Sequence, residues 1–229
     1  MGGSEQWHSQ TDLGDNRRLI QLDLPGFGRN SDMQPIDRIE GFAAWVLDTL
    51  TELGCDRFDL LGHSMGGMIV QEMVRLAPEH VSRLILYGTG AAGVLPGRFE
   101  TIETSIERAR SDGPRATARR IAATWFRDGE HSDEYPACAN IAERSSLAAI
   151  LSGLTAMRNW SGVEHLGRIQ SSTLVLWGDC DRTYSWPQTQ RLWDSIPDSH
   201  LAVVPGCAHA VHLEQPALFN RLVTHFLEM

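Results

Sequence analysis

The sequence predicts an α/β fold with a mostly parallel, doubly wound sheet, and three observations support this prediction. Short apolar runs alternate with longer runs of helical periodicity, a pattern typical of strands that are buried on both faces and joined by helices. Turns rich in glycine or polar residues follow several of these runs, at the end of a parallel sheet where functional groups gather. One interval between runs is much longer than a single crossover needs, which indicates an insertion.

Five short apolar runs are the predicted strands. Their residues are β-branched or otherwise apolar over almost their whole length, as expected for strands covered on both faces. They comprise residues 19–24, 58–61, 84–87, 173–177 and 201–204.

Three amphipathic helices are predicted around these strands. Each has an apolar stripe at the spacing of one helix face, and a glycine or proline ends the first two, Gly54 and Pro78 respectively. The stripes consist of Phe42, Val46, Leu50 and Leu53; of Ile69, Val70, Met73, Val74 and Ala77; and of Phe219, Leu222, Val223 and Phe226.

The long interval between Tyr87 and Thr173 predicts a helical lid over residues 91–165. The sheet-forming core is then divided into residues 1–90 and 166–229, and the polar run at 129–136 is predicted to be a loop between two lid helices. The apolar stripes of the lid are Ile102, Ile106 and Ala109; Ala118, Ile121, Ala122 and Trp125; and Leu147, Ile150, Leu151 and Leu154.

Composition describes a globular chain and argues against several classes of function. The 229 residues include 20 Lys and Arg and 29 Asp and Glu, for a net charge of −9, and 42% are apolar. An acidic chain without a basic stripe is poorly suited to nucleic acid or to an anionic membrane. No run reaches about 18 apolar residues, and the first 18 residues are largely polar, so neither a membrane span nor a secretory signal is predicted.

The four cysteines predict reduced thiols and hence a cytoplasmic protein. They are widely spaced and form no C-x-x-C pair, which argues against both a disulfide framework and a zinc site. Since no metal-ligand spacing is present, we expect neither a metal nor a cofactor. With nucleic acid and membranes disfavoured, the expected partner is a small-molecule substrate, and assembly into a homo-oligomer stays open. The cysteines are Cys55, Cys138, Cys180 and Cys207.

The most specific motif is Gly62-His63-Ser64-Met65-Gly66, placed between a predicted strand and a predicted helix. In that context G-x-S-x-G is a nucleophile elbow, a strained turn whose flanking positions require glycine. It exposes the Ser64 hydroxyl at a helix N-terminus, where the amide of Met65 is expected to form part of an oxyanion hole.

A nucleophilic serine needs a base and a carboxylate to orient that base. Candidate acids, Asp179 and Asp181, directly follow the strand at 173–177. Candidate bases, His209 and His212, follow the last strand. Both groups therefore belong to the end of the sheet where Ser64 is expected.

With these motifs, the chain resembles the α/β-hydrolase superfamily over all of its length except the lid. Further support comes from the runs at residues 23–29 (DLPGFGR) and 214–216 (EQP). The resemblance implies the chain order Ser, acid, His, with Asp181 as the acid of a G-x-x-D pattern and His209 as the base. It implies structural roles for His63 and His212.

Two positions depart from the family pattern without removing a reacting group. Ala208 stands where glycine commonly precedes the histidine, and Ser172 stands where proline often precedes the strand that carries the acid.

The expected activity is hydrolysis of a carboxylic ester or an enol-lactone, with a small apolar or aromatic substrate. Trp125, Met157 and Trp160 are the predicted substrate-contacting residues, and Arg158 and Arg182 are candidates to meet a substrate carboxylate. The alternatives are C–C hydrolysis of ring-cleavage products, a cofactor-free perhydrolase, and a member of the superfamily that binds a small molecule without turnover.

The resemblance also implies that N-terminal strands of the family's sheet are missing from this chain. The opening Met1-Gly2-Gly3-Ser4 matches the end of the family's oxyanion loop, which places the amide of Met1 as the second oxyanion donor. We expect the strands beginning near Leu19 and Phe58 either to pair directly or to leave backbone groups unpaired, and a version longer by about 25–30 residues to be more stable and more active.

Overall fold

Four parallel strands form the sheet at the centre of the molecule. The computed structural model describes residues 1–94 and 96–229. The strands are β1 (Phe58–His63), β2 (Val81–Tyr87), β3 (Ser172–Gly178) and β4 (Ser199–Val204), and they lie side by side in this order. Four of the five predicted strands are therefore confirmed, each with one or more additional residues.

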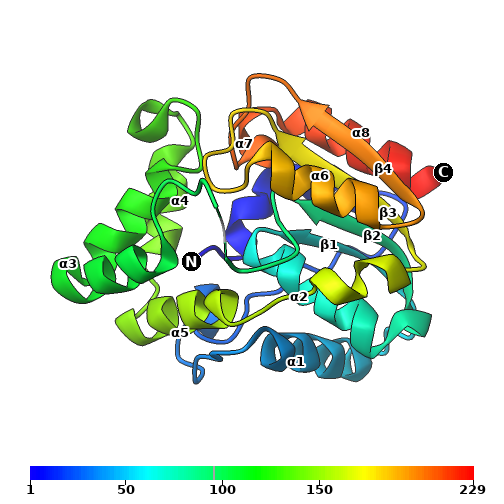
Figure 1. Cartoon of the computed structure of the whole chain (residues 1–229), viewed down its shortest axis with the longest axis horizontal. Coiled ribbons are helices and arrows are strands. Elements are labelled where there is room, and N and C mark those ends of the chain that lie inside the picture. The colour runs from blue at the N-terminus through cyan, green and yellow to red at the C-terminus, as the bar shows by residue number, and fades with distance from the viewer. Residues whose placement is uncertain (95) are drawn as a thin grey trace.

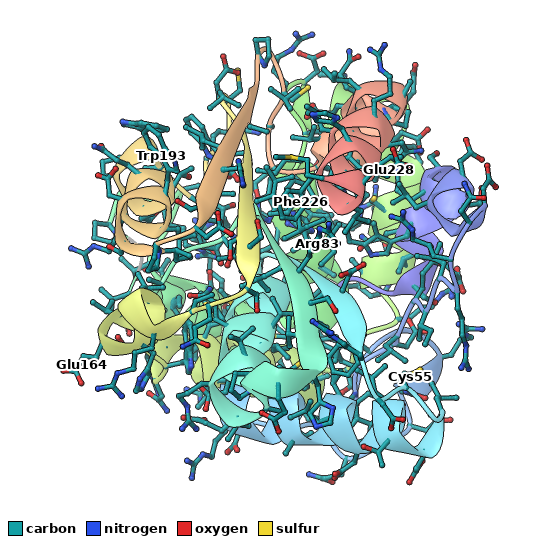
Figure 2. The ribbon with its side chains drawn as sticks, turned by 90° about the vertical axis from the view of Figure 1, so that its right-hand side faces the viewer. Cys55, Arg83, Glu164, Trp193, Phe226 and Glu228 are labelled. Atoms are coloured by element: carbon teal, nitrogen blue, oxygen red, sulfur yellow. The ribbon has the colours of Figure 1, made fainter. Side chains whose placement is uncertain are left out.

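Helices cover both faces of this sheet, as a parallel sheet requires. Along β2, Leu84 and Leu86 face the cluster formed with α1 (Ile39–Glu52), α2 (Met65–Leu76) and α6 (Trp186–Ser195). The alternate residues Ile85 and Tyr87 face α8 (Pro216–Glu228) and the 3-10 helix η1 (Ser4–Gly14). Figure 2 shows α6, which carries Trp193, and α8, which carries Phe226, on opposite sides of the strands.

The predicted lid is helical, and it lies beside the sheet rather than within its layers (Figure 1). It contains α3 (Ile102–Ala123), α4 (Tyr135–Ala142) and α5 (Leu147–Arg158), with α3 in contact with both other helices. The first two predicted lid helices form one element, α3, which is kinked at Gly113 (φ +82°) just before Pro114. The predicted loop at 129–136 contains the helical turn η4 (Gly129–His131) and the first residues of α4.

Four short helical segments complete the fold. They are η2 (Gly28–Asn30), η3 (Pro78–His80), η5 (Val163–Arg168) and α7 (Val211–Glu214). Within residues 1–94 and 96–229, none of the helices is both long and apolar enough to cross a lipid bilayer.

The prediction of a strand at residues 19–24 is wrong. This segment has no regular structure, and the only strand that β1 pairs with among the described residues is β2. Leu19, Ile20 and Leu22 line the same cavity as Phe58 and Leu60 of β1. Because a strand exists only through hydrogen bonds to a neighbouring strand, an apolar run that does not pair with β1 is not part of the sheet.

Candidate active site

Ser64 occupies the strained turn that the motif predicts. It lies between the last residue of β1 and the first residue of α2, with φ +57° and ψ −121°. Ser64 is the only non-glycine residue with positive φ within the described parts of the chain. Two hydrogen bonds hold its backbone. The Ser64 amide donates to the Tyr87 carbonyl (3.0 Å), and the Thr89 hydroxyl donates to the Ser64 carbonyl (2.8 Å). Strain of this kind persists only where the surrounding structure enforces it.

The structure requires glycine at Gly62, which belongs to the motif, and at Gly67, which follows it, but not at Gly66. A Cβ at Gly62 would overlap the backbone oxygen of Gly66, so Gly62 is required. Gly66, in contrast, faces open space, whereas a Cβ at Gly67 would collide with Thr89. The tight approach between α2 and Thr89, two residues after β2, therefore selects glycine at 67, a contact between distant segments that the motif alone does not contain.

Asp181 and His209 form a buried, directly hydrogen-bonded pair. His209 Nδ1 lies 2.7 Å from Asp181 Oδ2, and both side chains are almost completely inaccessible to solvent. The other carboxylate oxygen accepts hydrogen bonds from the backbone amides of Thr183 (2.7 Å) and Tyr184 (3.1 Å). With Nδ1 engaged, Nε2 is the nitrogen left to exchange a proton with a nucleophile.

The alternative acid has a different partner. Asp179 is exposed, and its Oδ1 accepts a hydrogen bond from the backbone amide of Gly206 (2.7 Å). It thereby ties the loop after β3 to the loop after β4, and its recorded hydrogen bonds do not include one to His209. The geometry thus favours Asp181 as the carboxylate that orients the histidine.

His63 and His212 support the backbone of His209. His63 Nε2 donates to the His209 carbonyl (3.0 Å), and the Tyr87 hydroxyl donates to the same carbonyl (2.8 Å). His212 Nδ1 lies 3.0 Å from the Tyr87 hydroxyl, and the His212 ring stacks on Trp7 with 4.4 Å between ring centroids. Burial lowers the pKa of His63 well below its usual value and that of His212 to about 3. Both rings are therefore neutral hydrogen-bonding groups at neutral pH.

Tyr87 is a site residue that sequence reasoning missed. Its ring is fully buried at the end of β2, and burial raises the pKa of its hydroxyl well above the usual value. The hydroxyl therefore stays protonated and can hold the His209 loop in place. A tyrosine directly after the aliphatic run Leu84-Ile85-Leu86, at the C-terminal end of the strand, is the signal that could have identified it.

A cavity of about 790 Å³ joins Ser64 and His209 to the lid and continues along the outer edge of β1. Met1 and Met65, the predicted oxyanion donors, both line it, and the direction of their amides stays a prediction. The lid contributes mainly apolar side chains, which include Ile121, Trp125, Cys138, Ile150, Leu154 and Met157. Such a cavity suits a small, largely apolar ligand.

The predicted substrate-contacting residues differ in their placement. Trp125 and Met157 line the cavity, but Trp160 lies against α2, where its indole nitrogen donates to Glu72 (3.3 Å). Placement against α2 leaves Trp160 without access to this cavity. Arg158 is exposed, and Arg182 donates to the carbonyl of Phe126 (3.0 Å).

Arg98, Phe99 and Thr183 line the cavity although sequence reasoning did not select them. Among the described residues, no group of three or more His, Cys, Asp or Glu side chains is arranged to hold a metal ion.

Comparison with known proteins identifies the family of this chain. Residues 2–222 match the family model described as the alpha/beta hydrolase family. The chain is 30% identical over 233 residues to a 2-hydroxy-6-oxo-6-phenylhexa-2,4-dienoate hydrolase of Burkholderia cepacia, with 92% of this chain and 77% of that protein covered. The chain therefore belongs to the alpha/beta hydrolase family and is a hydrolase.

Solved structures share the fold over the entire chain. The enol-lactonase of Burkholderia xenovorans LB400 superimposes with a TM-score of 0.91 at 21% identity, and 100% of this chain and 88% of that chain are covered. An esterase of Exiguobacterium antarcticum gives a TM-score of 0.90 at 21% identity with the same coverage. At this level of identity the likeness concerns the fold.

Proposed function

We propose that this protein is a serine hydrolase that cleaves a carboxylic ester or an enol-lactone of a small, largely apolar substrate. The observation that carries the proposal is the meeting of the Ser64 elbow and the Asp181–His209 pair at one apolar cavity. Chemistry of this kind needs a nucleophile, a base and an orienting acid at one point.

In the proposed mechanism, His209 Nε2 removes the hydroxyl proton of Ser64 as its oxygen attacks the substrate carbonyl. Asp181 keeps Nδ1 protonated and stabilises the imidazolium that forms. The backbone amide of Met65 and the backbone nitrogen of Met1, which in this chain is an amino group, stabilise the negative charge on the tetrahedral intermediate. The protonated His209 then transfers its proton to the leaving alcohol, and a water activated by the same ring hydrolyses the acyl-enzyme.

Hydrolysis of p-nitrophenyl esters tests this proposal. We expect turnover of short acyl chains by the wild-type protein and loss of turnover in Ser64→Ala. A matched control is Ser146→Ala, because Ser146 is the N-terminal capping residue of α5, where its hydroxyl accepts from the Ala149 amide. The proposal fails if no ester or lactone is cleaved, or if Ser64→Ala retains the wild-type rate.

C–C bond hydrolysis is the second candidate, and the 30% identical relative named as a dienoate hydrolase favours it. The same serine, histidine and acid would serve, with a carbon rather than an oxygen as the leaving atom. A coloured dienoate ring-cleavage product offered beside a panel of esters separates the two activities: higher kcat/KM for the dienoate would replace the first candidate with the second.

A further inference from the structure

Arg98 carries a positive charge into the wall of the catalytic cavity. It belongs to the segment that precedes α3, and it is half-buried. Its Nη1 donates to the backbone carbonyl of Glu100 (2.8 Å) and to the Ser105 hydroxyl (3.0 Å), which fixes the guanidinium. Its Nε is buried and has no hydrogen-bond partner among the described residues.

No carboxylate of the described residues forms an ion pair with Arg98. The nearby Glu100 carboxylate is bound by Arg120 (2.7 Å) and Arg108 (3.3 Å). Burial lowers the pKa of Arg98, because the cavity wall solvates its charge poorly. A buried charge without a partner is costly, and an anion placed beside it would offset that cost.

Tyr184 supplies a second polar group without a partner, close to the nucleophile. The residue is fully buried, and its hydroxyl has no hydrogen-bond partner among the described residues. Its ring stacks on His209 with 5.6 Å between centroids. Burial raises the pKa of the hydroxyl to about 12, while the nearby Ser64 hydroxyl and the Arg98 charge act in the opposite direction. Tyr184 is therefore a neutral hydroxyl close to Ser64, but it is not among the residues that line the cavity, which leaves Arg98 as the group that meets a ligand.

We propose that Arg98 forms an anion-binding subsite in the cavity wall, so that the substrate carries a carboxylate in addition to the bond that is cleaved. This inference rests on the proposed function, because it assigns the substrate class of the same cavity. The guanidinium binds the carboxylate through Nε and a terminal nitrogen, a geometry that arginine favours. The apolar lid residues contact the rest of the molecule.

A pair of esters matched in length tests the subsite. One is the mono-p-nitrophenyl ester of adipic acid, which ends in a carboxylate, and the other is p-nitrophenyl hexanoate, which ends in a methyl group. We expect the wild-type protein to prefer the acid, and Arg98→Gln to reduce this preference, as a ratio of kcat/KM values, by about 10- to 100-fold. Arg98→Lys should fall between them, since lysine keeps the charge but loses the bidentate geometry.

The matched control is Arg110→Gln, which removes an exposed arginine of the lid and should leave both kcat/KM values unchanged. The proposal is overturned if the wild-type protein shows no preference for the acid, or if Arg98→Gln lowers kcat/KM for both esters equally. Thermal unfolding of each variant establishes that it is folded.

Binding separates failure of this inference from failure of the proposed function. Calorimetry with Ser64→Ala compares hexanoate with hexanamide, which has the same size and no charge. We expect hexanoate to bind more tightly, and adding Arg98→Gln to weaken hexanoate selectively. Such binding without ester turnover would retain the subsite and reject the esterase proposal. Ester turnover with equal binding of hexanoate and hexanamide would do the reverse.

Discussion

The two sides of the catalytic cavity differ in how their polar groups are satisfied. On the sheet side, Asp181 accepts three hydrogen bonds, and the His209 carbonyl accepts two. By contrast, Arg98 Nε and the Thr183 hydroxyl, which line the cavity from the segment before α3 and from the loop after β3, are buried without partners among the described residues, and on the sheet side so is His212 Nε2. Groups that must be oriented before the reaction are already held, whereas the unpartnered groups are the ones available to a ligand.

The strongest test of the sheet side is removal of the reacting groups. We expect Ser64→Ala and His209→Ala each to lower kcat by on the order of 10⁵- to 10⁶-fold, because triad members act as a unit. His212→Ala should cost far less, since His212 acts only through Tyr87 and the His209 loop. Single-turnover rates with a p-nitrophenyl ester provide the measurement. Equal losses at the two histidines would show that the base is wrongly assigned.

Substitution of each candidate acid by asparagine tests which carboxylate orients His209. Asp181→Asn should lower kcat by about 10⁴-fold, because an amide favours the wrong tautomer of His209. Asp179→Asn is the matched control: its oxygen can still accept from the Gly206 amide, so we expect a loss of less than about tenfold. Steady-state kinetics of both variants decide the matter, and the opposite order would reject Asp181.

Acid stability tests the neutral histidines beneath the site. Burial lowers the pKa of His212 from 6.5 to about 3, so the unfolded chain binds this proton more readily than the folded chain. The free energy of unfolding therefore falls as pH decreases from about 6.5 towards 3, by up to about 1.4 kcal/mol per pH unit for this group. Below about pH 3 this contribution is absent.

Urea unfolding at several pH values measures the effect. His212→Gln should show a shallower loss over this range than the wild-type protein, whereas His131→Gln, at an exposed position, should follow the wild-type curve. Identical slopes for wild type and His212→Gln would contradict the buried, neutral state of His212.

The smallest expected effect concerns Tyr184, in the loop after β3, and it is an increase in stability rather than a loss. Tyr184→Phe removes a buried hydroxyl that has no partner, so we expect the free energy of unfolding to rise by about 0.5–1 kcal/mol. Tyr87→Phe is the matched control from the sheet side, since it removes a hydroxyl that bonds the His209 carbonyl, and it should destabilise by about 1–3 kcal/mol. Thermal unfolding compares both, and destabilisation by Tyr184→Phe would mean that its hydroxyl has a partner.

The sequence by itself determined the features that depend on local spacing. The motif around Ser64 and the helices α1, α2 and α8 were predicted, because helix periodicity and a strand–turn–helix elbow are properties of neighbouring residues. The chain order of serine, acid and histidine and the choice of Asp181 and His209 came from the family resemblance, and the 2.7 Å contact between Asp181 and His209 agrees with it.

Only the tertiary structure decided the features that depend on distant segments. The apolar run at 19–24 has the composition of a strand but does not pair with a neighbouring strand. Trp160 is a large apolar side chain of the kind that lines pockets, but it packs on α2. Contacts with other elements define the surroundings of three further residues: Tyr87 bonds the His209 loop, Arg98 bonds Ser105 of α3, and Tyr184 lies near Ser64. Sequence periodicity specifies which face of an element is apolar, but hydrogen-bond partners and burial arise only when separate elements pack together.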